Sequence, residues 1–478
     1  MIDTTAIRKR ILELAYQGNL SEQSINDGDV DVLYNNIRKF VANKELPEVE
    51  FDERFIEIPG NWKWVRVGNI AKINPKNDCN DNEEASFIPM ALVTEGFHNK
   101  HTFEIKEWGT IKKGFNHLLE GDIGVAKITP CFQNRKSVVF QNLHNGFGAC
   151  TTELIVLRTD NDCLLNEYLL YFFKTEEFIH KGVDSFTGVV GQQRIHKDYL
   201  KMSPIPLPPV EEQRRIVKKI KESFELIDVI DRLQQHYSSD IEILKSKIID
   251  AGIQGKLTEQ LPKDGTAEEL IEQIEIQKNT ILKNRKGRVD KKIKAIDGDF
   301  PYEIPSHWKW IRFGNIGLFK KGPFGSALTK SMFVPKGENT VKVYEQQHAI
   351  NKDNTLGTYY ITREYFDDSM SGFEVLPGDI IVSCAGTIGE TYIMPDDIEQ
   401  GIINQALMRV TLAEGVNRKF FQYYFDANLK KSAQNESNGS AIKNIPPFDV
   451  MKNWYFPIPP LEEQERIVVK IENILTIL

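Results

Sequence analysis

The stretch that decides the fold reads PVEEQRRIVKKIKESFELIDVIDRLQQHYSSDIEILKSKIIDA and runs from Pro209 to Ala251. It contains no glycine, no further proline, and apolar residues at spacings of three and four. This pattern predicts one long helix with a heptad seam, beginning after the prolines and ending near Gly252. The seam residues, which we expect to form the scaffold and partner-contacting face, are Ile216, Ile220, Ile227, Ile230, Tyr237, Ile241, Leu244 and Ile248.

Three blocks of sequence occur twice, in the same order, at offsets between 237 and 251. These offsets are close to half of the 478 residues, so the chain is built from two copies of one unit. The matched blocks are QGNLSEQ (17–23) with QGKLTEQ (254–260), IPGNWKWVRVGNI (58–70) with IPSHWKWIRFGNI (304–316), and PLPPVEEQRRIV (206–217) with PIPPLEEQERIV (457–468).

The second copy of the long helix is divided between the two ends of the chain. Residues 460–478 match its first half and residues 1–20 match its last part, with no counterpart for about residues 228–237. The chain is therefore a circular arrangement opened inside a helix. We expect the terminal helices to lie close together and to complete a pseudo-twofold partner for the central helix.

Two segments of mixed helix and strand character lie between these helices. We predict strands at 122–128, 154–158, 379–383 and 406–411, and helices at 166–180, 267–296 and 418–431. The expected fold is α+β, with two mixed α/β domains separated by a long antiparallel coiled-coil helix pair in a pseudo-twofold tandem repeat. The expected divisions are a helix and linker (1–59), a first domain (60–208), the central helix (209–257), a helical linker (258–305), a second domain (306–459) and a C-terminal helix (460–478).

Composition excludes several classes of protein. With 41% hydrophobic and 27% charged residues, the chain is typical of globular proteins. The N-terminus has no apolar signal region, and no apolar run reaches the ~20 residues needed to cross a bilayer. The five cysteines are far apart and form no Cys-x-x-Cys motif, which favours the reducing cytoplasm and argues against a zinc ribbon.

The net charge of −8 is not evenly distributed. Residues 60–205 hold 17 basic and 17 acidic residues, and residues 306–456 hold 16 of each. The excess negative charge therefore lies in the helices and linkers. If the chain binds DNA, domains without excess positive charge would leave much of the phosphate neutralisation to partners, which is a hypothesis.

The candidate DNA contacts are loops that combine glycine, amide and basic residues. Glycine permits close approach of the backbone, and Gln, Asn, Arg and Lys carry donors for base edges. The alternatives are a plain connecting loop and a solvated charged face. The candidates are Lys127, Gln133, Asn134, Arg135, Lys136, Gly188, Gln192, Gln193 and Arg194 in the first domain, and Lys320, Lys321, Ser326, Lys330, Gly439, Ser440, Lys443 and Asn444 in the second.

Motifs for catalysis or metal binding fail on spacing. Residues 444–448 (NIPPF) carry one residue too many for an adenine methyltransferase motif, and 252–258 (GIQGKLT) fits a helix end better than a P-loop. Glu104-Ile105-Lys106 is a surface strand rather than half of a nuclease motif, and His98 and His101 have no accompanying ligand cluster. We expect no catalytic residue and no metal site.

The paired tryptophans (62, 64, 308 and 310) are expected to anchor each domain on the helices rather than to stack on bases.

The repeated Pro-x-Pro-Pro-[Val/Leu]-Glu-Glu-Gln-x-Arg-Ile-Val and Pro-x-x-Trp-x-Trp-[Val/Ile]-Arg-x-Gly-Asn-Ile blocks and the Gln-Gly-[Asn/Lys]-Leu helix ends resemble the specificity subunit of type I restriction-modification systems. The resemblance covers almost the whole chain. It implies two target-recognition domains, each reading half of a bipartite site in double-stranded DNA, on helices that set the spacer.

The resemblance also implies partners and cofactors. Two modification subunits would dock on the helices, restriction subunits would add to them, and AdoMet, ATP and Mg²⁺ would bind to those partners and not to this chain. No membrane partner is implied. The alternatives are the recognition subunit of a type IIB-like system, a protein–protein adaptor without DNA readout, and an independent enzyme, which the absent motifs disfavour.

Overall fold

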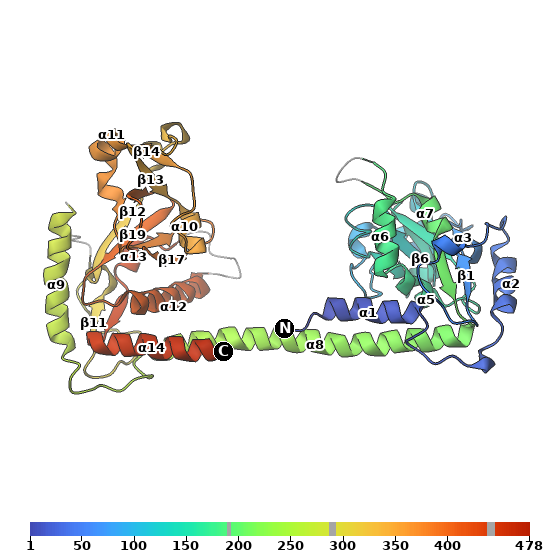
Figure 1. Ribbon diagram of the computed structural model, residues 1–478, viewed down its shortest axis with the longest axis horizontal. Helices are drawn as coiled ribbons and strands as arrows, with labels where there is room; N and C mark the ends of the chain where they lie inside the picture. The colour runs from blue at the N-terminus through green and yellow to red at the C-terminus, as the bar shows by residue number, and fades with distance from the viewer. Residues whose placement is uncertain (189–192, 286–292, 437–444) are drawn as a thin grey trace. The chain divides into compact units, whose positions relative to one another are not determined.

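The computed structural model describes residues 1–188, 193–285, 293–436 and 445–478 (Figure 1). The chain divides into two compact units, Met1–His236 and Tyr237–Leu478. Helix α8 (Val210–Ile253) contributes its first part to unit 1 and its last part to unit 2. The predicted long helix is therefore confirmed. Among the described residues, no helix combines the length and apolar character that a membrane crossing requires.

A two-stranded sheet joins the start and the end of the first domain. Strand β1 (Lys63–Arg66) pairs antiparallel with β10 (Pro204–Leu207), which directly precedes α8. Unit 1 also contains the helices and short helical turns α1 (Thr4–Tyr16), α2 (Val30–Val41), α3 (Val67–Ile70), α4 (Trp108–Ile111), α5 (Asn166–Phe172), α6 (Glu176–Asp184) and α7 (Lys197–Met202).

Two four-stranded sheets form the body of the first domain. The order β2-β9-β6-β7 is antiparallel throughout, whereas β4-β3-β8-β5 contains one parallel pair, β3 with β8. The strands are β2 (Lys72–Ile73), β3 (Glu84–Ile88), β4 (Glu104–Glu107), β5 (Asn116–Leu119), β6 (Ile123–Ala126), β7 (Ser137–Val139), β8 (Phe147–Cys150) and β9 (Leu154–Arg158).

Unit 2 repeats this topology strand for strand. Its sheets are β11-β20, β12-β19-β16-β17 and β14-β13-β18-β15, again with one parallel pair, β13 with β18. The strands are β11 (Lys309–Arg312), β12 (Gly317–Lys321), β13 (Thr340–Tyr344), β14 (Tyr360–Thr362), β15 (Glu374–Val375), β16 (Ile380–Ser383), β17 (Thr391–Ile393), β18 (Gly401–Ile403), β19 (Leu407–Leu412) and β20 (Tyr455–Ile458).

Unit 2 differs from unit 1 in some of its helices, since the single helix α12 stands where unit 1 has α5 and α6. Besides the last part of α8, the helices of unit 2 are α9 (Ala267–Asn284), α10 (Gln346–Asn351), α11 (Arg363–Tyr365), α12 (Arg418–Glu436), α13 (Phe448–Met451) and α14 (Leu461–Ile477). The four predicted strands correspond to β6, β9, β16 and β19. The sequences of the two inserts differ strongly, so their shared topology was not visible in the sequence.

Two helix predictions need correction. Residues 166–180 form two helices, α5 and α6, because the backbone of Thr175 is extended and its hydroxyl accepts a hydrogen bond from Phe178 N, which starts a new helix. The predicted helix 267–296 ends at Asn284, and residues 293–296 are not helical.

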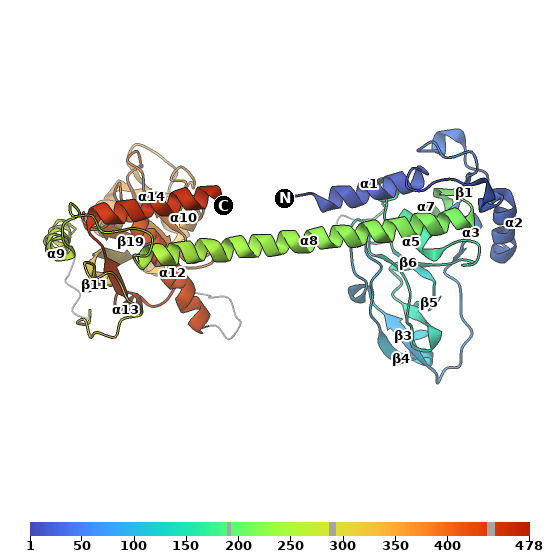
Figure 2. The ribbon, with the colours of Figure 1, turned by 90° about the horizontal axis from the view of Figure 1, so that it is seen from below.

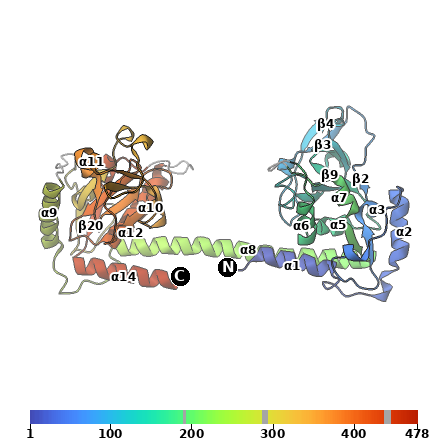
Figure 3. The ribbon, with the colours of Figure 1, turned by 45° about the horizontal axis from the view of Figure 1, so that its top comes forward.

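Each unit packs one terminal helix against its own part of α8. In unit 1, α1 runs antiparallel to α8, with Thr4 bonded to Asp231 and Arg8 paired with Asp228 at 2.5 Å (Figure 2). In unit 2, α14 lies beside the end of α8, where Gly252 leaves no space for a Cβ atom against the Ile471 side chain (Figure 3). The proximity of the two terminal helices to each other stays a prediction.

The predicted helix ends are confirmed at two equivalent turns. Helix α1 ends before Gly18, and α8 ends before Gly255. The backbone φ angles of these two glycines are +72° and +71°. A Cβ atom at either glycine would lie 2.4 Å from a proline side-chain atom, Pro59 Cγ or Pro305 Cγ. Only glycine fits, because both the backbone conformation and the close approach exclude a side chain.

Candidate DNA-reading surface and its scaffold junction

Glu212, in the first turn of α8, is fully buried and accepts three hydrogen bonds. Trp62 Nε1 and Asn61 Nδ2 donate to one carboxylate oxygen at 2.8 and 3.3 Å, and Gln23 Nε2 donates to the other at 3.1 Å. These donors come from the strand region of the first domain and from the segment after α1. A buried carboxylate with three donors therefore joins the domain to the scaffold helices.

The next residues of the repeated motif make equally specific contacts. Gln213, also fully buried, accepts a hydrogen bond from Leu165 N at 2.9 Å, just before α5. Its amide group donates to Pro208 O at 3.0 Å. Arg215 pairs with Asp27 at 2.5 Å, and the hydrogen bonds from its guanidinium lower the pKa of that carboxyl below its ordinary value.

Unit 2 repeats this junction. Glu463 is fully buried and accepts a hydrogen bond from Trp308 Nε1 at 3.0 Å. Gln464 accepts one from Asn417 N at 2.8 Å, just before α12. The prediction that Trp62 and Trp308 anchor the domains on the helices is confirmed by these bonds.

The remaining two tryptophans have another role. Trp64 packs edge-on against Phe55, and Trp310 packs against Phe300 and Tyr302, all outside the long helices. Neither ring contacts the scaffold helices in these packings. The prediction of anchoring on the helices is therefore wrong for Trp64 and Trp310.

Two candidate DNA-contacting segments of the first domain lie side by side. Thr129 N donates to Gln193 O at 2.9 Å and Ile195 N donates to Lys127 O at 2.9 Å. This brings the segment after β6 against the segment before α7. Gln133 and Asn134 are exposed on the first segment, and the Asn134 amide donates to Glu95 at 3.0 Å.

The other candidates of the first domain vary in accessibility. The Arg135 side chain is only 12% exposed and pairs with Glu176 at 2.9 Å, whereas Arg194 is 40% exposed and pairs with Glu153 at 3.0 Å. Lys136 is half-buried and Gly188 is exposed, with φ of +110°. Gln192 lies outside the described residues.

The buried side chain of Lys174, whose role the sequence did not reveal, supports the backbone of this candidate DNA-contacting surface. Lys174 is fully buried, and its Nζ donates to Gly96 O at 2.6 Å and to Arg135 O at 3.0 Å. Arg135 Nε in turn donates to Lys174 O at 3.0 Å. Burial, with a smaller contribution from Arg135, lowers the pKa of Lys174 to about 7. A single lysine between two helices gives no sequence signal for such a position.

The candidates of the second domain sit elsewhere in the topology. Lys320 and Lys321 end the edge strand β12, and Ser326 and Lys330 are exposed on the segment that follows. Lys320 Nζ lies 4.7 Å from the centroid of the Phe373 ring. Gly439, Ser440, Lys443 and Asn444 lie outside the described residues.

The structural equivalent of the first domain's 127–136 segment is 384–390, because both follow the same strand, β6 or β16. It contains Gly386 and Gly389, both with positive φ, and Thr387 is exposed. Sequence reasoning missed this segment, because it carries one charge and cannot be aligned without the strand topology. The two closely spaced glycines, with exposed Thr387 between them, are the signal that it offers.

The sequence motifs that failed the spacing for catalysis or metal binding lie in ordinary strands, loops and helix starts. Glu104-Ile105-Lys106 lies in the largely exposed strand β4, and residues 445–447 precede α13. His98 Nε2 lies 3.2 Å from Asp228 of α8, and His101 accepts a hydrogen bond from Gln141 N. The described residues contain no cluster of three His, Cys, Asp or Glu side chains suited to a metal ion.

Known proteins with related sequences share one description. Residues 59–236 and 325–477 match the family of the type I restriction modification DNA specificity domain. The chain is 29% identical to the EcoAI specificity subunit of Escherichia coli, over 98% of this chain and 88% of that protein. It is 28% identical to the EcoEI specificity subunit of Escherichia coli, with the same coverage, and 25% identical to the MjaVIII specificity subunit of Methanocaldococcus jannaschii, over 88% and 87%.

Solved structures share the fold. A chain from a study of complex assembly and conformational transition of the type I R-M system covers 87% of this chain and 91% of its own length, with a TM-score of 0.62 and 18% identity. The HsdS subunit from Thermoanaerobacter tengcongensis covers 88% and 91%, with a TM-score of 0.51 and 18% identity. Since the family match spans both repeated units, the chain belongs to the type I restriction-modification DNA specificity family.

Proposed function

We propose that this chain is the DNA sequence-recognition subunit of a type I restriction-modification complex, without a catalytic centre of its own. The observation that carries the proposal is the repeated junction, in which Glu212 and Glu463 hold two domains of equal topology and different sequence. Each domain, about residues 60–208 and 306–459, reads one half of a bipartite site. Two readers joined by a helix multiply their specificity, since each good bidentate base contact contributes only ~1–3 kcal/mol.

Within the first domain, the described part of the reading surface consists of segment 127–136 and the adjoining residues 187, 188, 193 and 194. Exposed Gln133 and Asn134 and the 40% exposed Arg194 supply donors for base edges or phosphates. Arg135 and Lys174 hold the backbone of the surface in place. In the second domain, the candidates are segment 384–390 and the residues Lys320, Lys321, Ser326, Lys330, Gly439, Ser440, Lys443 and Asn444.

The modification subunits dock on the exposed apolar face of α8. Leu226, Leu233 and Tyr237 follow one another at spacings of seven and four, so they lie on one face of the helix, and they are 69%, 60% and 62% exposed. Ile216, Ile220, Ile227 and Ile248 are buried within the units, and Leu244 is 42% exposed. Two modification subunits, with restriction subunits added to them, carry AdoMet, ATP and Mg²⁺ in the cytoplasm.

The test is methylation by the chain reconstituted with the modification subunit of its own system. We expect AdoMet-dependent adenine methylation at one bipartite sequence, which mapping of methylated adenines in the host genome would reveal. Replacing residues 60–208 by the equivalent domain of another specificity subunit should change one half-site only. A swap that changes both half-sites or neither would contradict the assignment of one domain to each half-site.

The same reconstitution separates this function from a protein–protein adaptor. A reader gives sequence-selective binding that weakens as salt rises, because phosphate contacts release counterions. An adaptor gives an assembled complex with no preference for any DNA sequence. Methylation by the purified chain alone with AdoMet would overturn the assignment of catalysis to the partner.

A further inference from the structure

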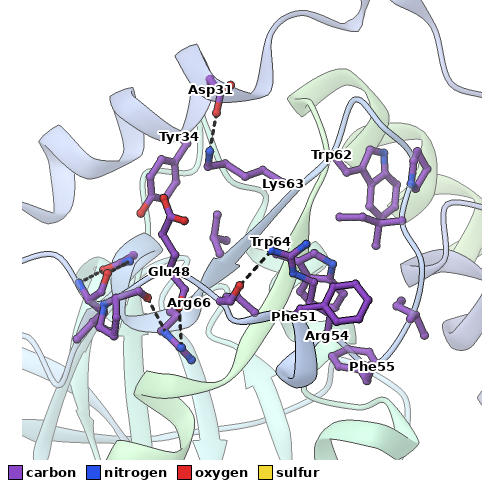
Figure 4. Close-up of a pocket in the computed structure, with 18 of the residues that line it drawn as sticks. Asp31, Tyr34, Glu48, Phe51, Arg54, Phe55, Trp62, Lys63, Trp64 and Arg66 are labelled. Atoms are coloured by element: carbon purple, nitrogen blue, oxygen red, sulfur yellow. Dashed lines mark hydrogen bonds and ion pairs between the residues drawn. The ribbon is translucent and has the colours of Figure 1, made fainter.

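Unit 1 contains a polar groove of about 1410 Å³ between α2, the segment that follows it, and β1. Figure 4 shows Tyr34 and Lys63 on one side of it, with Phe51, Arg54 and Trp64 gathered on the other. The groove lies entirely within unit 1. It is not lined by any of the candidate DNA-contacting residues.

Unit 2 has a groove of about 840 Å³ at the equivalent place in the repeat. The sequence Glu-Ile-Pro-x-x-Trp-Lys-Trp lines both, as residues 57–64 in one and 303–310 in the other. Seven of the eight positions line each groove, and they are the same seven. We call these two surfaces the twin grooves.

Packing explains only part of this repetition. Trp62 and Trp308 are buried against the scaffold glutamates, and Lys63 pairs with Asp31 of α2 at 2.7 Å. Glu57 and Glu303 differ, since both side chains are exposed and neither forms a hydrogen bond or ion pair within the described part of the chain. Contacts within the chain therefore do not account for these two glutamates, whereas a partner outside the chain would.

The chemistry of the twin grooves favours a cation. In groove 1, the Arg66 guanidinium is already bound to Glu53 and to backbone carbonyls, and Lys63 is bound to Asp31. The remaining cation, Arg54, donates to Val49 O and has Phe300 at its counterpart position in unit 2. The residues that line groove 1 include four carboxylates and three basic groups, and those that line groove 2 include two carboxylates and one basic group.

Half-buried aromatic rings stand beside these carboxylates in both grooves. Trp64 and Tyr34 line the first, and Trp310 and Tyr302 line the second. A carboxylate next to an aromatic face binds Arg or Lys side chains through charge-assisted hydrogen bonds and cation–π attraction. A nucleic acid is disfavoured, because its phosphates would face the excess negative charge.

We propose that each of the twin grooves receives an Arg- or Lys-bearing segment of one modification subunit. The inference rests on the proposed function, because two identical subunits bound to one chain need the same binding surface twice. It adds a second contact to the docking on α8. This contact lies on the segments that precede β1 in unit 1 and β11 in unit 2. Glu57 and Glu303 are its specificity-determining carboxylates.

The test is assembly of the purified modification subunit on charge-reversal variants, without DNA, followed by native mass spectrometry and titration calorimetry. Glu57→Lys and Glu303→Lys should each weaken one of the two binding steps at least tenfold, and the double variant should weaken both. Glu83→Lys and Glu338→Lys are the matched controls, because both glutamates are exposed and each lies in one of the two domains. These variants should assemble as the wild type does. Normal assembly of the double variant would overturn the proposal.

Photo-crosslinking identifies the occupant. A photoreactive phenylalanine analogue in place of Phe51 or Phe300, which are 84% and 42% exposed, should crosslink to an Arg- or Lys-bearing peptide of the modification subunit. Crosslinks only to DNA, or only to an acidic peptide, would contradict the proposed docking of an Arg- or Lys-bearing segment. A wild-type complex that assembles but does not methylate a bipartite site would instead contradict the proposed function, so the two failures are distinct.

Discussion

At the residue scale, the structure explains why the Glu-Glu-Gln-x-Arg motif occurs twice. The first glutamate, Glu211 or Glu462, faces solvent, whereas the second, Glu212 or Glu463, is fully buried and bonded to a tryptophan. Adjacent glutamates therefore have opposite environments within one helical turn. The buried one determines how a domain sits on its helices.

Replacing the buried glutamate should be costly. Glu212→Ala leaves Trp62 Nε1, Asn61 Nδ2 and Gln23 Nε2 without their acceptor, and we expect the free energy of unfolding of unit 1 to fall by about 2–3 kcal/mol. Urea denaturation followed by tryptophan fluorescence measures this. Glu211→Ala is the matched control, with an expected change below about 0.5 kcal/mol. Equal effects of the two substitutions would contradict the junction.

Lys174 predicts a pH dependence of stability. Because its pKa is lowered to about 7 in the folded protein, the unfolded chain binds more protons between that pH and the lysine's ordinary pKa. The contribution of Lys174 to the free energy of unfolding therefore rises as pH increases above 7. Lys174→Met should remove this rise, as measured by urea denaturation from pH 6 to pH 9.

The control for Lys174 is Lys181→Met, since Lys181 is 46% exposed and paired with Glu177. That variant should retain the wild-type pH dependence. If Lys174→Met shows the same pH dependence as wild type, the buried lysine does not titrate in this range.

We also expect Lys174→Met to weaken recognition of one half-site, because the backbone of Arg135 loses a hydrogen bond that holds the reading surface.

At the element scale, α8 combines buried ends with an exposed middle. Ile216 and Ile220 are buried in unit 1 and Ile248 in unit 2, but the seam residues Tyr237 and Leu244 are 62% and 42% exposed. The heptad pattern predicted one continuous seam. The terminal helices α1 and α14 cover only parts of it, since α1 begins at Thr4, opposite Asp231, and α14 lies beside Gly252.

The length of α8 should determine the spacer between half-sites. Insertion of four residues after Gln235 adds about one turn and roughly 6 Å, so we expect the accepted spacer to lengthen by about one or two base pairs. Mapping of methylated adenines measures the spacer directly. Gln235→Ala, at an exposed position of the same segment, should leave it unchanged. An unchanged spacer in the insertion variant would defeat the idea that the helix is a ruler.

At the scale of the whole molecule, charge distribution governs what the chain can do alone. The two domains are electrically balanced, and the net charge of −8 lies on the helices and linkers. We therefore expect phosphate neutralisation to come largely from the partners. The proposed docking in the twin grooves is compatible with this division, since it pairs exposed carboxylates of this chain with Arg or Lys side chains of a partner.

This distribution predicts weak binding of random DNA by the isolated chain. Fluorescence anisotropy between about 50 and 200 mM salt should give a shallow salt dependence for the chain and a steep one for its complex with modification subunits, because the slope counts neutralised phosphates. The same duplex and the modification subunit alone serve as controls. Equal slopes for chain and complex would mean that the chain itself supplies the phosphate contacts.

Several features followed from the sequence because their causes are local or repeated. Helix α8, the turns at Gly18 and Gly255, and strands such as β6 and β19 depend on periodicity and capping within a few residues. The two-unit organisation followed from repeated blocks. The break between α5 and α6 did not, because an extended Thr175 competes with an otherwise helical pattern.

The candidate reading surface was only partly visible in the sequence. Exposed Gln133 and Asn134 were identified by residue type, whereas Lys174 and segment 384–390 required the tertiary structure. Residue type alone also could not distinguish Arg135, which is engaged inside the domain, from an accessible arginine. Exposure depends on contacts such as that of Arg135 with Glu176, which lies far along the chain.

The sequence alone was enough to establish two units, a long helix between them, and a scaffold that repeats while its inserts diverge, since periodicity and self-similarity are written in residue order. The tertiary structure decided that the divergent inserts share one strand topology, that a buried glutamate joins each to its helices, and that the Trp-Lys-Trp segments line paired grooves. The physical reason is that pairing, burial and cavities arise between residues distant in the chain, which local patterns do not encode.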